Sequence, residues 1–357
     1  MQSNTTKTPL LQIAGRNIGA FQPTLIIAEI GVNHDGSLRR ALELVELAVA
    51  CGADAVKLQI FQASTLMHAS SQFADYQQQR VSDADPTAML RRYELSAADV
   101  REIVAAIGRH KLLAIATPFS PDDVEFIATL CLAAVKIASP DLVNRPLLSR
   151  VASLNVPMIV STGAANLEEI DASCGWLRSW NCSLALLHCI SSYPTPAGDA
   201  NLCWIGELAD RCGVPVGFSD HTTDIFAGAL AVASGAVIVE KHLTYDRHAN
   251  GPDHSASADP EQFAQYVKMI RQAEVLCGKP GKRVLEVEAD VRRVSRQSLV
   301  AVRDLLTGEA LCDKDLTVQR PGTGILAADI ANAVGRRVTQ NVPRGTLLQW
   351  DMLADAA

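Results

Sequence analysis

The chain has 357 residues, of which 48% are hydrophobic and 20% are charged, and its formal net charge at pH 7 is −7. At roughly 150 residues per domain, this length predicts about two domains. The composition excludes an intrinsically disordered chain, which would be poorer in apolar residues. The negative charge excludes a general positive field that gathers nucleic acid or anionic lipid, so we expect neither nucleic acid nor a membrane as a partner.

The nine cysteines are odd in number and include no C-x-x-C pair, which indicates neither a disulfide framework nor a structural zinc site. The N-terminal segment lacks a basic stretch followed by an apolar core. No apolar run approaches the roughly 18 residues of a membrane-spanning helix. We therefore expect a cytoplasmic protein that is neither exported nor membrane-spanning.

Short apolar runs alternate with segments of helical period from Thr24 to about Cys277, which is typical of parallel βα units. Eight such units over about 250 residues favour a closed (β/α)8 TIM barrel. An open doubly wound sheet is less favoured, because no Gly-x-Gly-x-x-Gly turn follows the first strand. The expected strands are 24–30, 54–60, 112–117, 134–139, 157–162, 183–189, 215–220 and 236–242.

Helical patterns follow several of these strands, for example in segments 37–52, 166–180 and 259–278. In the first of them, Ser37 can cap the start of the helix and Gly52 can end it in a left-handed turn.

The composition and the hydrophobic pattern of the sequence change after Gly278. This change predicts that a barrel domain, with an N-terminal extension, comprises residues 1–278. Residues 279–296 are charged and punctuated by glycine and proline, which predicts a linker. Residues 297–357 carry short apolar runs broken at turn sequences, which predicts a compact β-rich module. A module of this size is marginal by itself, so we expect it to pack on a partner.

Polar side chains interrupt the apolar strands near their carboxyl ends, where TIM barrels carry their chemistry. A lone lysine in such a strand is most simply a snorkelling side chain. Two of them, Lys57 and Lys136, together with nearby hydroxyls favour a cradle for phosphate or carboxylate oxygens. The candidate hydroxyls are those of Thr117, Ser139 and Ser161.

Two histidines, His221 and His242, end the last two predicted strands. A single strand-end histidine is more often a hydrogen-bonding residue than a ligand. A pair on adjacent strands favours a shared divalent metal such as Mn, Zn, Co or Fe. The turn at Asn33, His34, Asp35 and Gly36 supports two readings, a structural turn and a substrate contact through His34.

Several motifs occur in one order along nearly the whole chain: IIAEIGVNHDGS, ADAVKLQ, IATPFS, VKIAS, IVSTG, LLHCISSYPTP, GFSDHT, VEKHLT, GPDHSAS and TVQRPGTGI. With them the chain resembles the sialic acid synthase family, whose members make nonulosonic acids from phosphoenolpyruvate and an N-acylated amino sugar. The resemblance implies a (β/α)8 barrel followed by a small domain similar to type III antifreeze protein. It also implies a domain-swapped homodimer, in which Arg320 reaches the substrate of the partner subunit.

The resemblance further implies roles for individual residues. A divalent ion, most often Mn with Mg or Co as other candidates, would bind to His221 and His242. Phosphoenolpyruvate would bind to Lys57, Thr117, Lys136, Ser139, Ser161 and Ser191. The amino sugar would contact Gln59, Tyr193, Asp253 and Arg320. The catalytic residues would be Glu29, Lys57, Lys136 and Asp141.

Two positions depart from the family pattern. Asp141 stands where many members have a glutamate, and Ser191 lies in an Ile-Ser-Ser sequence where many members have Thr-Asn or Thr-Thr. The sequence therefore predicts a synthase that condenses phosphoenolpyruvate with N-acetylmannosamine or a 2,4-diacetamido-6-deoxyhexose and releases phosphate by C–O cleavage. A 3-deoxy-ulosonate phosphate synthase that uses a phosphorylated aldose is one alternative, and a non-catalytic sugar-binding barrel is another.

Overall fold

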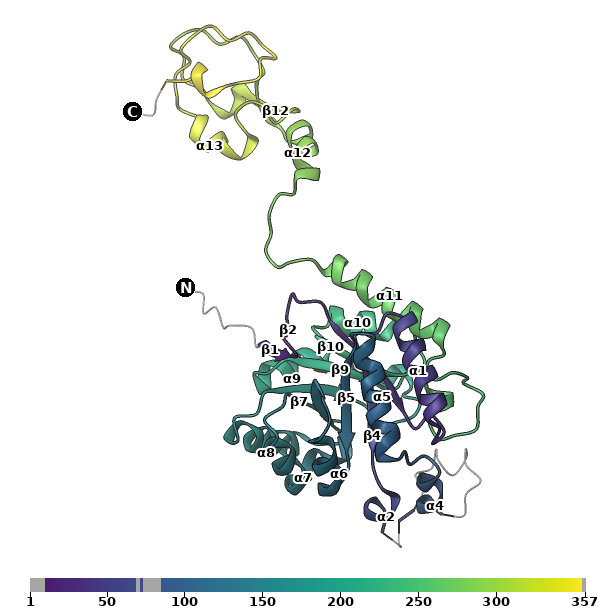
Figure 1. Ribbon diagram of the computed structural model, residues 1–357. Coiled ribbons are helices and arrows are strands. Elements are labelled where there is room, and N and C mark those ends of the chain that lie inside the picture. The colour runs from purple at the N-terminus through teal and green to yellow at the C-terminus, as the bar shows by residue number, and fades with distance from the viewer. Residues whose placement is uncertain (1–9, 69–70, 73–84, 355–357) are drawn as a thin grey trace. The chain divides into compact units, whose positions relative to one another are not determined.

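The computed structural model describes residues 10–68, 71–72 and 85–354. The chain forms two compact units, Met1–Lys279 and Pro280–Ala357, which are coloured purple to green and green to yellow in Figure 1. The boundary lies next to the end of the predicted barrel domain, and each unit is described by itself below.

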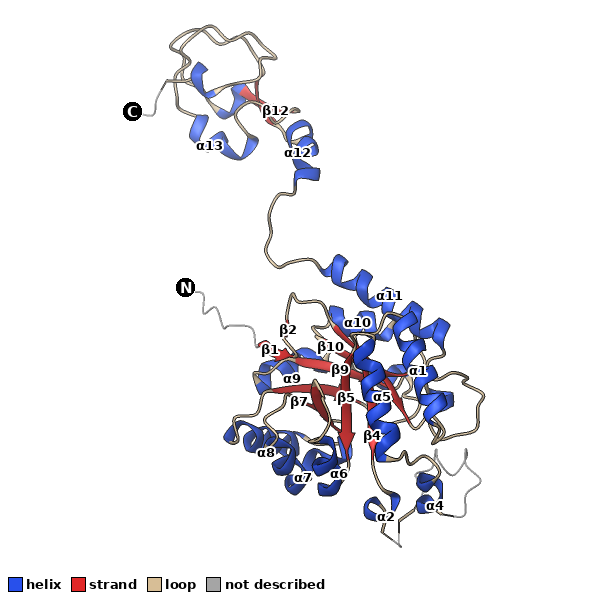
Figure 2. Ribbon diagram, in the orientation of Figure 1, coloured by secondary structure: helices blue, strands red, loops and turns tan. Residues whose placement is uncertain are grey.

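The first unit is a closed barrel of parallel strands in the order β10-β3-β4-β5-β6-β7-β8-β9. The expected TIM barrel is thereby confirmed, and Figure 2 shows its strands surrounded by helices. The barrel strands are β3 (Leu25–Gly31), β4 (Ala55–Ile60), β5 (Leu113–Pro118), β6 (Ala134–Ile137), β7 (Met158–Ser161), β8 (Leu184–Cys189), β9 (Val216–Asp220) and β10 (Ile238–His242).

The strand β6 ends two residues before the expected position. A 3₁₀ turn over Ser139–Val143 follows it, with Pro140 near its start. Proline has no backbone N–H and cannot continue the ladder of a strand, which explains the early end.

Helices follow the strands as expected, and the predicted caps are present. The Ser37 hydroxyl accepts a hydrogen bond from the Arg40 N–H, and Gly52 has φ +82°, the left-handed conformation that favours glycine. The helices of this unit are α1 (Leu38–Ala50), α2 (Ala63–Leu66), α4 (Pro86–Arg91), α5 (Ala97–Arg109), α6 (Pro121–Ile127), α7 (Arg145–Ala152), α8 (Leu167–Ser179), α9 (Trp204–Cys212), α10 (Ala227–Ala233) and α11 (Pro260–Cys277). None of the helices in the described ranges has the length and apolarity needed to cross a bilayer.

The strands divide their side chains between two separate cores because successive residues point to opposite faces of a sheet. One set, including Ile26, Val56 and Val160, packs outward against the helices. The alternate set, including Ile27 and Ile159, fills the barrel interior. An antiparallel hairpin of β1 (Leu10–Ile13) and β2 (Arg16–Gly19) contributes aliphatic side chains to the same inner core.

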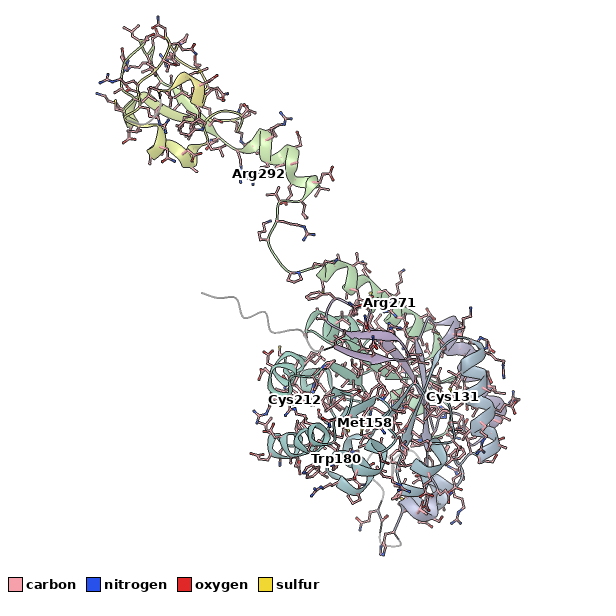
Figure 3. The ribbon with its side chains drawn as sticks, turned by 60° about the vertical axis from the view of Figure 1, so that its left-hand side comes forward. Cys131, Met158, Trp180, Cys212, Arg271 and Arg292 are labelled. Atoms are coloured by element: carbon pink, nitrogen blue, oxygen red, sulfur yellow. The ribbon has the colours of Figure 1, made fainter. Side chains whose placement is uncertain are left out.

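A shared carboxylate ties this hairpin to the barrel. Asp54 accepts hydrogen bonds or ion pairs from Arg16 at 2.9 Å, Arg271 at 2.6 Å and the Ile26 N–H at 2.8 Å. Arg271 lies on α11, as labelled in Figure 3. The helix α11 and the hairpin of β1 and β2 are therefore both bound to Asp54, directly before β4.

The second unit has its own small core, built from side chains such as Leu299, Ile325 and Leu348. Its antiparallel pair is β11 (Ser298–Ala301) with β12 (Leu316–Gln319), and its helices are α12 (Ala289–Ser295) and α13 (Ile330–Ala333). Isolated bridges, such as Val300 to Leu347, connect the remaining segments. The helix α12 occupies part of the segment predicted as a linker.

Candidate active site

Polar side chains form a second layer inside the barrel, directly above the inner aliphatic core. On most strands the residue two positions after an inner-core residue is polar, and it faces inward because the side-chain period is two. Glu29 follows Ile27 in this way, and Lys57 follows Ala55. The complete layer consists of Glu29, Lys57, Thr117, Lys136, Ser161, Ser219 and Glu240, all buried.

Four charged side chains in this layer form one connected cluster. The Lys57 ammonium lies 2.6 Å from Glu29 Oε2 and 3.0 Å from Glu240 Oε2. The Lys136 ammonium lies 3.8 Å from Glu240 Oε1 and donates to the Ile137 carbonyl at 3.0 Å. Ser219 donates to Glu240 Oε1 at 2.9 Å. Two cations and two anions therefore balance within a space that has almost no access to water.

Burial and mutual attraction shift the ionisation of this cluster in opposite ways. Burial, offset only in part by Glu240, lowers the pKa of the Lys57 ammonium to about 8. Burial alone would raise the pKa of the Glu240 carboxyl, but Lys136 and Lys57 lower it well below its usual range. Glu240 is therefore a carboxylate at neutral pH, and Lys57 titrates close to physiological pH.

Hydroxyl groups without partners lie in the same layer. Thr117 Oγ1 and Ser161 Oγ are buried and have no hydrogen-bond partner among the described residues. A buried polar atom without a partner costs free energy, so such atoms commonly mark a ligand site. Ser139 and Ser191 lie nearby, because a Cβ added to Gly163 would collide with both of their Oγ atoms. Ser139 Oγ also accepts the Gly163 N–H at 3.0 Å.

The two predicted metal ligands face each other. The rings of His221 and His242 have centroids 5.5 Å apart. His221 Nδ1 lies 3.0 Å from the Ile190 carbonyl and must donate to it, which leaves Nε2 with a free lone pair in the neutral ring. A hydrogen bond from the other ring nitrogen to a carbonyl is what orients a metal-binding histidine.

His242 fits a ligand role for a different reason. Its Nδ1 is buried and has no hydrogen-bond partner within the described ranges, and Asp253 Oδ2 lies 3.8 Å away. Burial and the neighbouring cations hold the pKa of His242 well below its usual value, so the ring is neutral and able to coordinate. No group of three or more His, Cys, Asp or Glu side chains suited to a metal occurs among the described residues. Water or substrate would thus have to complete the coordination of an ion held here.

Three of the four residues expected to contact a sugar, Gln59, Tyr193 and Asp253, also lie at this end of the barrel. The Tyr193 and His221 rings lie tilted against each other with centroids 4.0 Å apart, and Asp253 lies beside His242 as described. A Cβ added to Gly31 would come within 2.8 Å of Gln59 Nε2 and 2.6 Å of Glu29 Oε1, which places both side chains over that glycine. Glu29 Oε1 has no hydrogen-bond partner among the described residues.

Two further expected site residues are not among the inward-facing strand residues of this layer. Asp141 is half-buried in the 3₁₀ turn after β6, where Oδ1 accepts from Asn144 Nδ2 at 2.9 Å. Burial raises the pKa of the Asp141 carboxyl, against opposing effects of Asn144 and Lys136. Arg320 is an exposed residue of the second unit, just after β12.

Two buried groups of the site were not assigned a role from the sequence. Glu240 contacts both lysines. It alternates with Ile238 and His242 on the same face of β10, and this alternation is the sequence pattern that indicates an inward-facing side chain. Cys189 ends β8 beside the histidine pair, and its Sγ lies 3.8 Å from His221 Nδ1. Burial raises the pKa of the Cys189 thiol, but the charge of a protonated His221 ring and its hydrogen bond lower it to about 7. Against the effect of burial, the same pairing raises the pKa of His221, so the thiolate and the imidazolium form together, and a metal would need the neutral ring instead.

Comparisons with known proteins agree with the fold and the motifs. The sequence matches the NeuB family over residues 44–282 and the SAF domain over residues 296–354. An N,N'-diacetyllegionaminic acid synthase from Legionella pneumophila is 39% identical over 342 residues, which cover 93% of this chain and 95% of that protein. A protein of the same name from Campylobacter jejuni is 36% identical over 333 residues, covering 92% of this chain and 100% of its own length.

A solved structure supports the same relationship. The N-acetylneuraminic acid (sialic acid) synthetase from Leptospira borgpetersenii superposes with a TM-score of 0.72 at 30% identity, covering 80% of this chain and 95% of that one. The resemblance to the sialic acid synthases is thereby confirmed, together with the expectation of an enzyme of that type. With matches across both units, the chain belongs to the NeuB family.

Proposed function

We propose that the chain is a nonulosonic acid synthase, which joins phosphoenolpyruvate to the open-chain aldehyde of an N-acylated amino sugar and releases phosphate. The observation that carries the proposal is the combination, at one end of the barrel, of the Lys57 and Lys136 cluster with the His221 and His242 pair. The lysines suit an anionic substrate, and the histidines suit a divalent ion.

Phosphoenolpyruvate carries a phosphate and a carboxylate, and this layer offers donors for both. Lys57 and Lys136 supply the positive charge. The hydroxyls of Thr117 and Ser161 have no hydrogen-bond partner in the part of the chain that the structure describes and would donate to substrate oxygens, with Ser139 and Ser191 at the same rim. Glu29 and Glu240 neutralise the lysines before the substrate arrives, so an incoming anion competes with them for the ammonium groups.

His221 and His242 would hold the divalent ion, with Mn as the first candidate and Mg or Co next. Such an ion supplies Lewis-acid activation of the aldehyde carbonyl. Tyr193 and Asp253 lie against these two histidines, and Gln59 lies beside Glu29, so the sugar would extend from the histidine pair across the mouth of the barrel.

The reaction forms one C–C bond and breaks one C–O bond. C3 of the enol attacks the aldehyde carbon, whose oxygen becomes an alkoxide, and positive charge develops at C2. Water adds to C2, and Glu29 is suited to accept its proton and return it to the alkoxide, because Oε1 is buried, lies near Gln59 and has no hydrogen-bond partner among the described residues. The C2–O bond to phosphate then breaks in the tetrahedral phosphohemiketal, and the C2 hydroxyl becomes the carbonyl and gives its proton to the departing phosphate. Lys57 and Lys136 balance the charge of this leaving group. A catalytic role for Asp141 stays a prediction.

The sugar is proposed from the relatives. Two proteins 36–39% identical to this chain are named N,N'-diacetyllegionaminic acid synthases, which makes a 2,4-diacetamido-6-deoxyhexose the first candidate. N-acetylmannosamine is the second candidate, in keeping with the name of the related synthetase of known structure. We further propose a domain-swapped homodimer in which Arg320 reaches the sugar held by the partner, and a cytoplasmic location in keeping with nine free cysteines.

Phosphate release from phosphoenolpyruvate tests the proposal. The purified chain is assayed with Mn and with each of three acceptors: a diacetamido-deoxyhexose, N-acetylmannosamine and arabinose 5-phosphate. We expect release with an amino sugar, loss of release after chelation, and recovery when Mn is returned. Release only with the sugar phosphate would move the chain to the 3-deoxy-ulosonate phosphate synthases, and no release with any acceptor would contradict the proposal.

A further inference from the structure

The position of Asp253 depends on a long segment that follows β10. Residues 243–258 leave the barrel after His242 and return to it before α11 begins at Pro260. Asp253 comes near the end of this segment, and its Oδ2 lies 3.8 Å from His242 Nδ1. A segment of this length needs contacts outside itself to hold one carboxylate in a fixed place.

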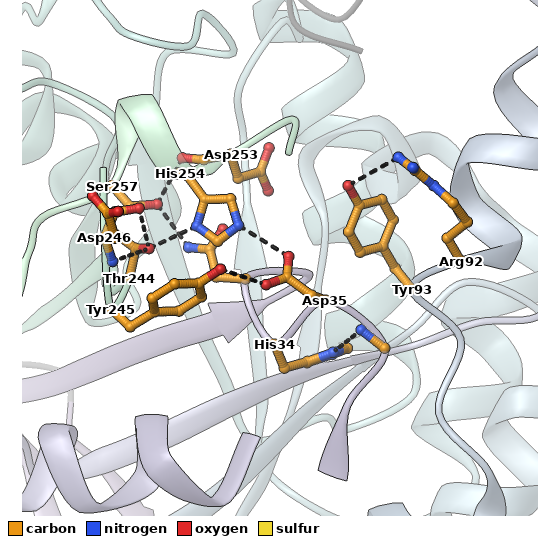
Figure 4. A network of polar contacts seen from close by, with 12 residues as sticks. His34, Asp35, Arg92, Tyr93, Thr244, Tyr245, Asp246, Asp253, His254 and Ser257 are labelled. Atoms are coloured by element: carbon orange, nitrogen blue, oxygen red, sulfur yellow. Dashed lines mark hydrogen bonds and ion pairs between the residues drawn. The ribbon is translucent and has the colours of Figure 1, made fainter. Parts of the chain in front are cut away.

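Those contacts come from the turn between β3 and α1, more than 200 residues away in sequence (Figure 4). Asp35 Oδ1 accepts from His254 Nε2 at 3.1 Å, and Asp35 Oδ2 accepts from the Tyr245 hydroxyl at 2.7 Å. Arg40 of α1 stacks over the Tyr245 ring at 3.7 Å. One carboxylate thus binds two points of the segment at once, and His254 is the residue directly after Asp253.

His254 is fixed on its other side as well. Its Nδ1 lies 2.6 Å from Thr244 Oγ1, and the ring is fully buried. A Cβ added to Gly251 would come within 2.7 Å of the His254 ring, so only glycine leaves room for the ring there. The imidazole is therefore held between Thr244 and Asp35 and packs closely against Gly251, so residues on both sides of Asp253 contact it.

Asn33 adds a second connection from the same turn. Its amide donates to the Leu243 carbonyl at 2.9 Å and to Ser257 Oγ at 2.8 Å. Ser257 in turn donates to the Asp253 carbonyl at 2.7 Å. The other ionisable residue of the turn, His34, does not reach the segment in this way: its Nδ1 accepts the Gly36 N–H at 3.1 Å within the turn.

We propose that Asn33 and Asp35 are positioning residues, which hold residues 243–258 through His254, Tyr245 and Ser257 and thereby set Asp253 against His242. This inference rests on the proposed function for the identity of the molecule that Asp253 binds, an N-acylated amino sugar. The turn between β3 and α1 thus affects binding of the amino sugar without contacting the sugar itself.

Asp35→Asn is the first test, because its side chain is 31% exposed and the substitution keeps its shape. Losing hydrogen bonds to a charged acceptor should raise the KM for the amino sugar about tenfold. The KM for phosphoenolpyruvate and the bound Mn should match the parent. The matched control is Asp246→Asn, an exposed aspartate of the same segment whose side chain binds only the His248 N–H among the contacts recorded for it. An unchanged KM in Asp35→Asn, or an equal rise in the control, would overturn the proposal.

A double-mutant cycle separates positioning from general destabilisation. If Asp35 acts through Asp253, then Asp35→Asn should add nothing to the KM of Asp253→Asn, whereas independent roles would multiply. Tyr245→Phe removes one of the two hydrogen bonds to Asp35 and should raise the KM by a smaller factor, about threefold. Multiplicative effects in the cycle would refute the inference.

Amide hydrogen exchange gives a readout that needs no activity. Residues 243–258 should exchange faster in Asp35→Asn than in the parent chain or in Asp246→Asn. Equal exchange would refute the positioning role. If the parent releases no phosphate with any acceptor, the proposed function fails, and the exchange comparison alone then decides whether the turn holds the segment.

Discussion

The inward side chains at the N-terminal end of the barrel are aliphatic, whereas two residues further along the same strands they are charged or hydroxylated. Ile115 and Thr117 of β5 show the contrast on one strand, and Ala134 and Lys136 show it on the next. Burial of an aliphatic side chain stabilises the fold by about 1.5–3 kcal/mol. Burial of ion pairs contributes little net stability, because desolvation offsets the attraction. The aliphatic layer at the N-terminal end, called the lower layer here, therefore stabilises the barrel. The polar layer above it, called the upper layer, contributes chemistry rather than stability.

The largest expected effect comes from the upper layer. Glu29→Gln keeps the size of the side chain but cannot accept a proton, so turnover should fall about 10²- to 10⁴-fold. Phosphate release measured with saturating substrates checks this, and bound Mn should be unchanged. The control is Glu46→Gln, whose carboxylate lies on α1 with a side chain 66% exposed. Full turnover in Glu29→Gln would remove Glu29 from the mechanism.

The next effect concerns the histidine pair. His221→Ala should weaken Mn binding at least about 100-fold, because even the loss of an outer partner of a ligand costs 10- to 100-fold. Titration of the apoprotein with Mn checks this. His188→Gln is the matched control: His188 lies on the neighbouring strand β8 but turns outward, where Nε2 lies 2.8 Å from the Ala200 carbonyl. Equal Mn affinity in both variants would place the ion elsewhere.

His188 also shows how far the sequence predicts such a site. The sequence shows that polar residues occur at the strand ends, but their position at an end does not separate adjacent ones into inward-facing and outward-facing sets. Lys241 turns outward to pair with Asp220 at 2.8 Å, while its neighbours Glu240 and His242 turn inward. The period of two in a strand carries this distinction, and it would have identified Glu240 as a site residue.

Other features of the site depend on contacts that no local pattern contains. The barrel was predictable because the strands and the capped helices follow one another in a regular order. The hydrogen bond between Asp35 and His254 joins residues 219 positions apart in sequence. No local pattern in the sequence indicates which residues of these two segments meet, so the contact could not be predicted. Asp141 is a comparable case, since its hydrogen bond to Asn144 follows from the 3₁₀ turn that replaces the end of the expected strand.

The lower layer should respond to mutation in the opposite way to the upper one. Ile115→Ala removes a fully buried side chain from the inner core and should lower the free energy of unfolding by about 2–5 kcal/mol. The KM for phosphoenolpyruvate should stay at the parent value. Urea unfolding followed by tryptophan fluorescence, with Trp350 of the second unit replaced by phenylalanine, reports on the barrel. A raised KM with unchanged stability would contradict the division into two layers.

Thr117→Val, two residues along the same strand, should show the reverse. The hydroxyl is buried without a partner among the described residues, so its removal should leave the free energy of unfolding unchanged or raise it slightly. The KM for phosphoenolpyruvate should rise about tenfold, because the substrate loses a hydrogen-bond donor. A destabilised Thr117→Val protein with a normal KM would make this hydroxyl structural.

The smallest expected effect is a pH dependence that has opposite signs for binding and for stability. Burial lowers the pKa of Lys57 to about 8, so the ammonium is lost as the pH rises through that value. The kcat/KM for phosphoenolpyruvate reports the free enzyme and should fall about fourfold between pH 7 and pH 8.5.

Whereas kcat/KM should fall as the pH rises, the contribution of Lys57 to the free energy of unfolding should increase over the alkaline range. Between the folded pKa near 8 and the usual value of 10.5, the unfolded chain holds more of this proton, so the free energy of unfolding rises with pH. Glu240→Gln provides the control, because removing a carboxylate 3.0 Å away takes away an attraction that raises the pKa of Lys57. The alkaline limb of kcat/KM should then move to lower pH. If the alkaline limb of kcat/KM does not move in Glu240→Gln, it reports the titration of a group other than Lys57. The chemical contrast between the two layers would then depend on the hydroxyls and the histidines rather than on this lysine.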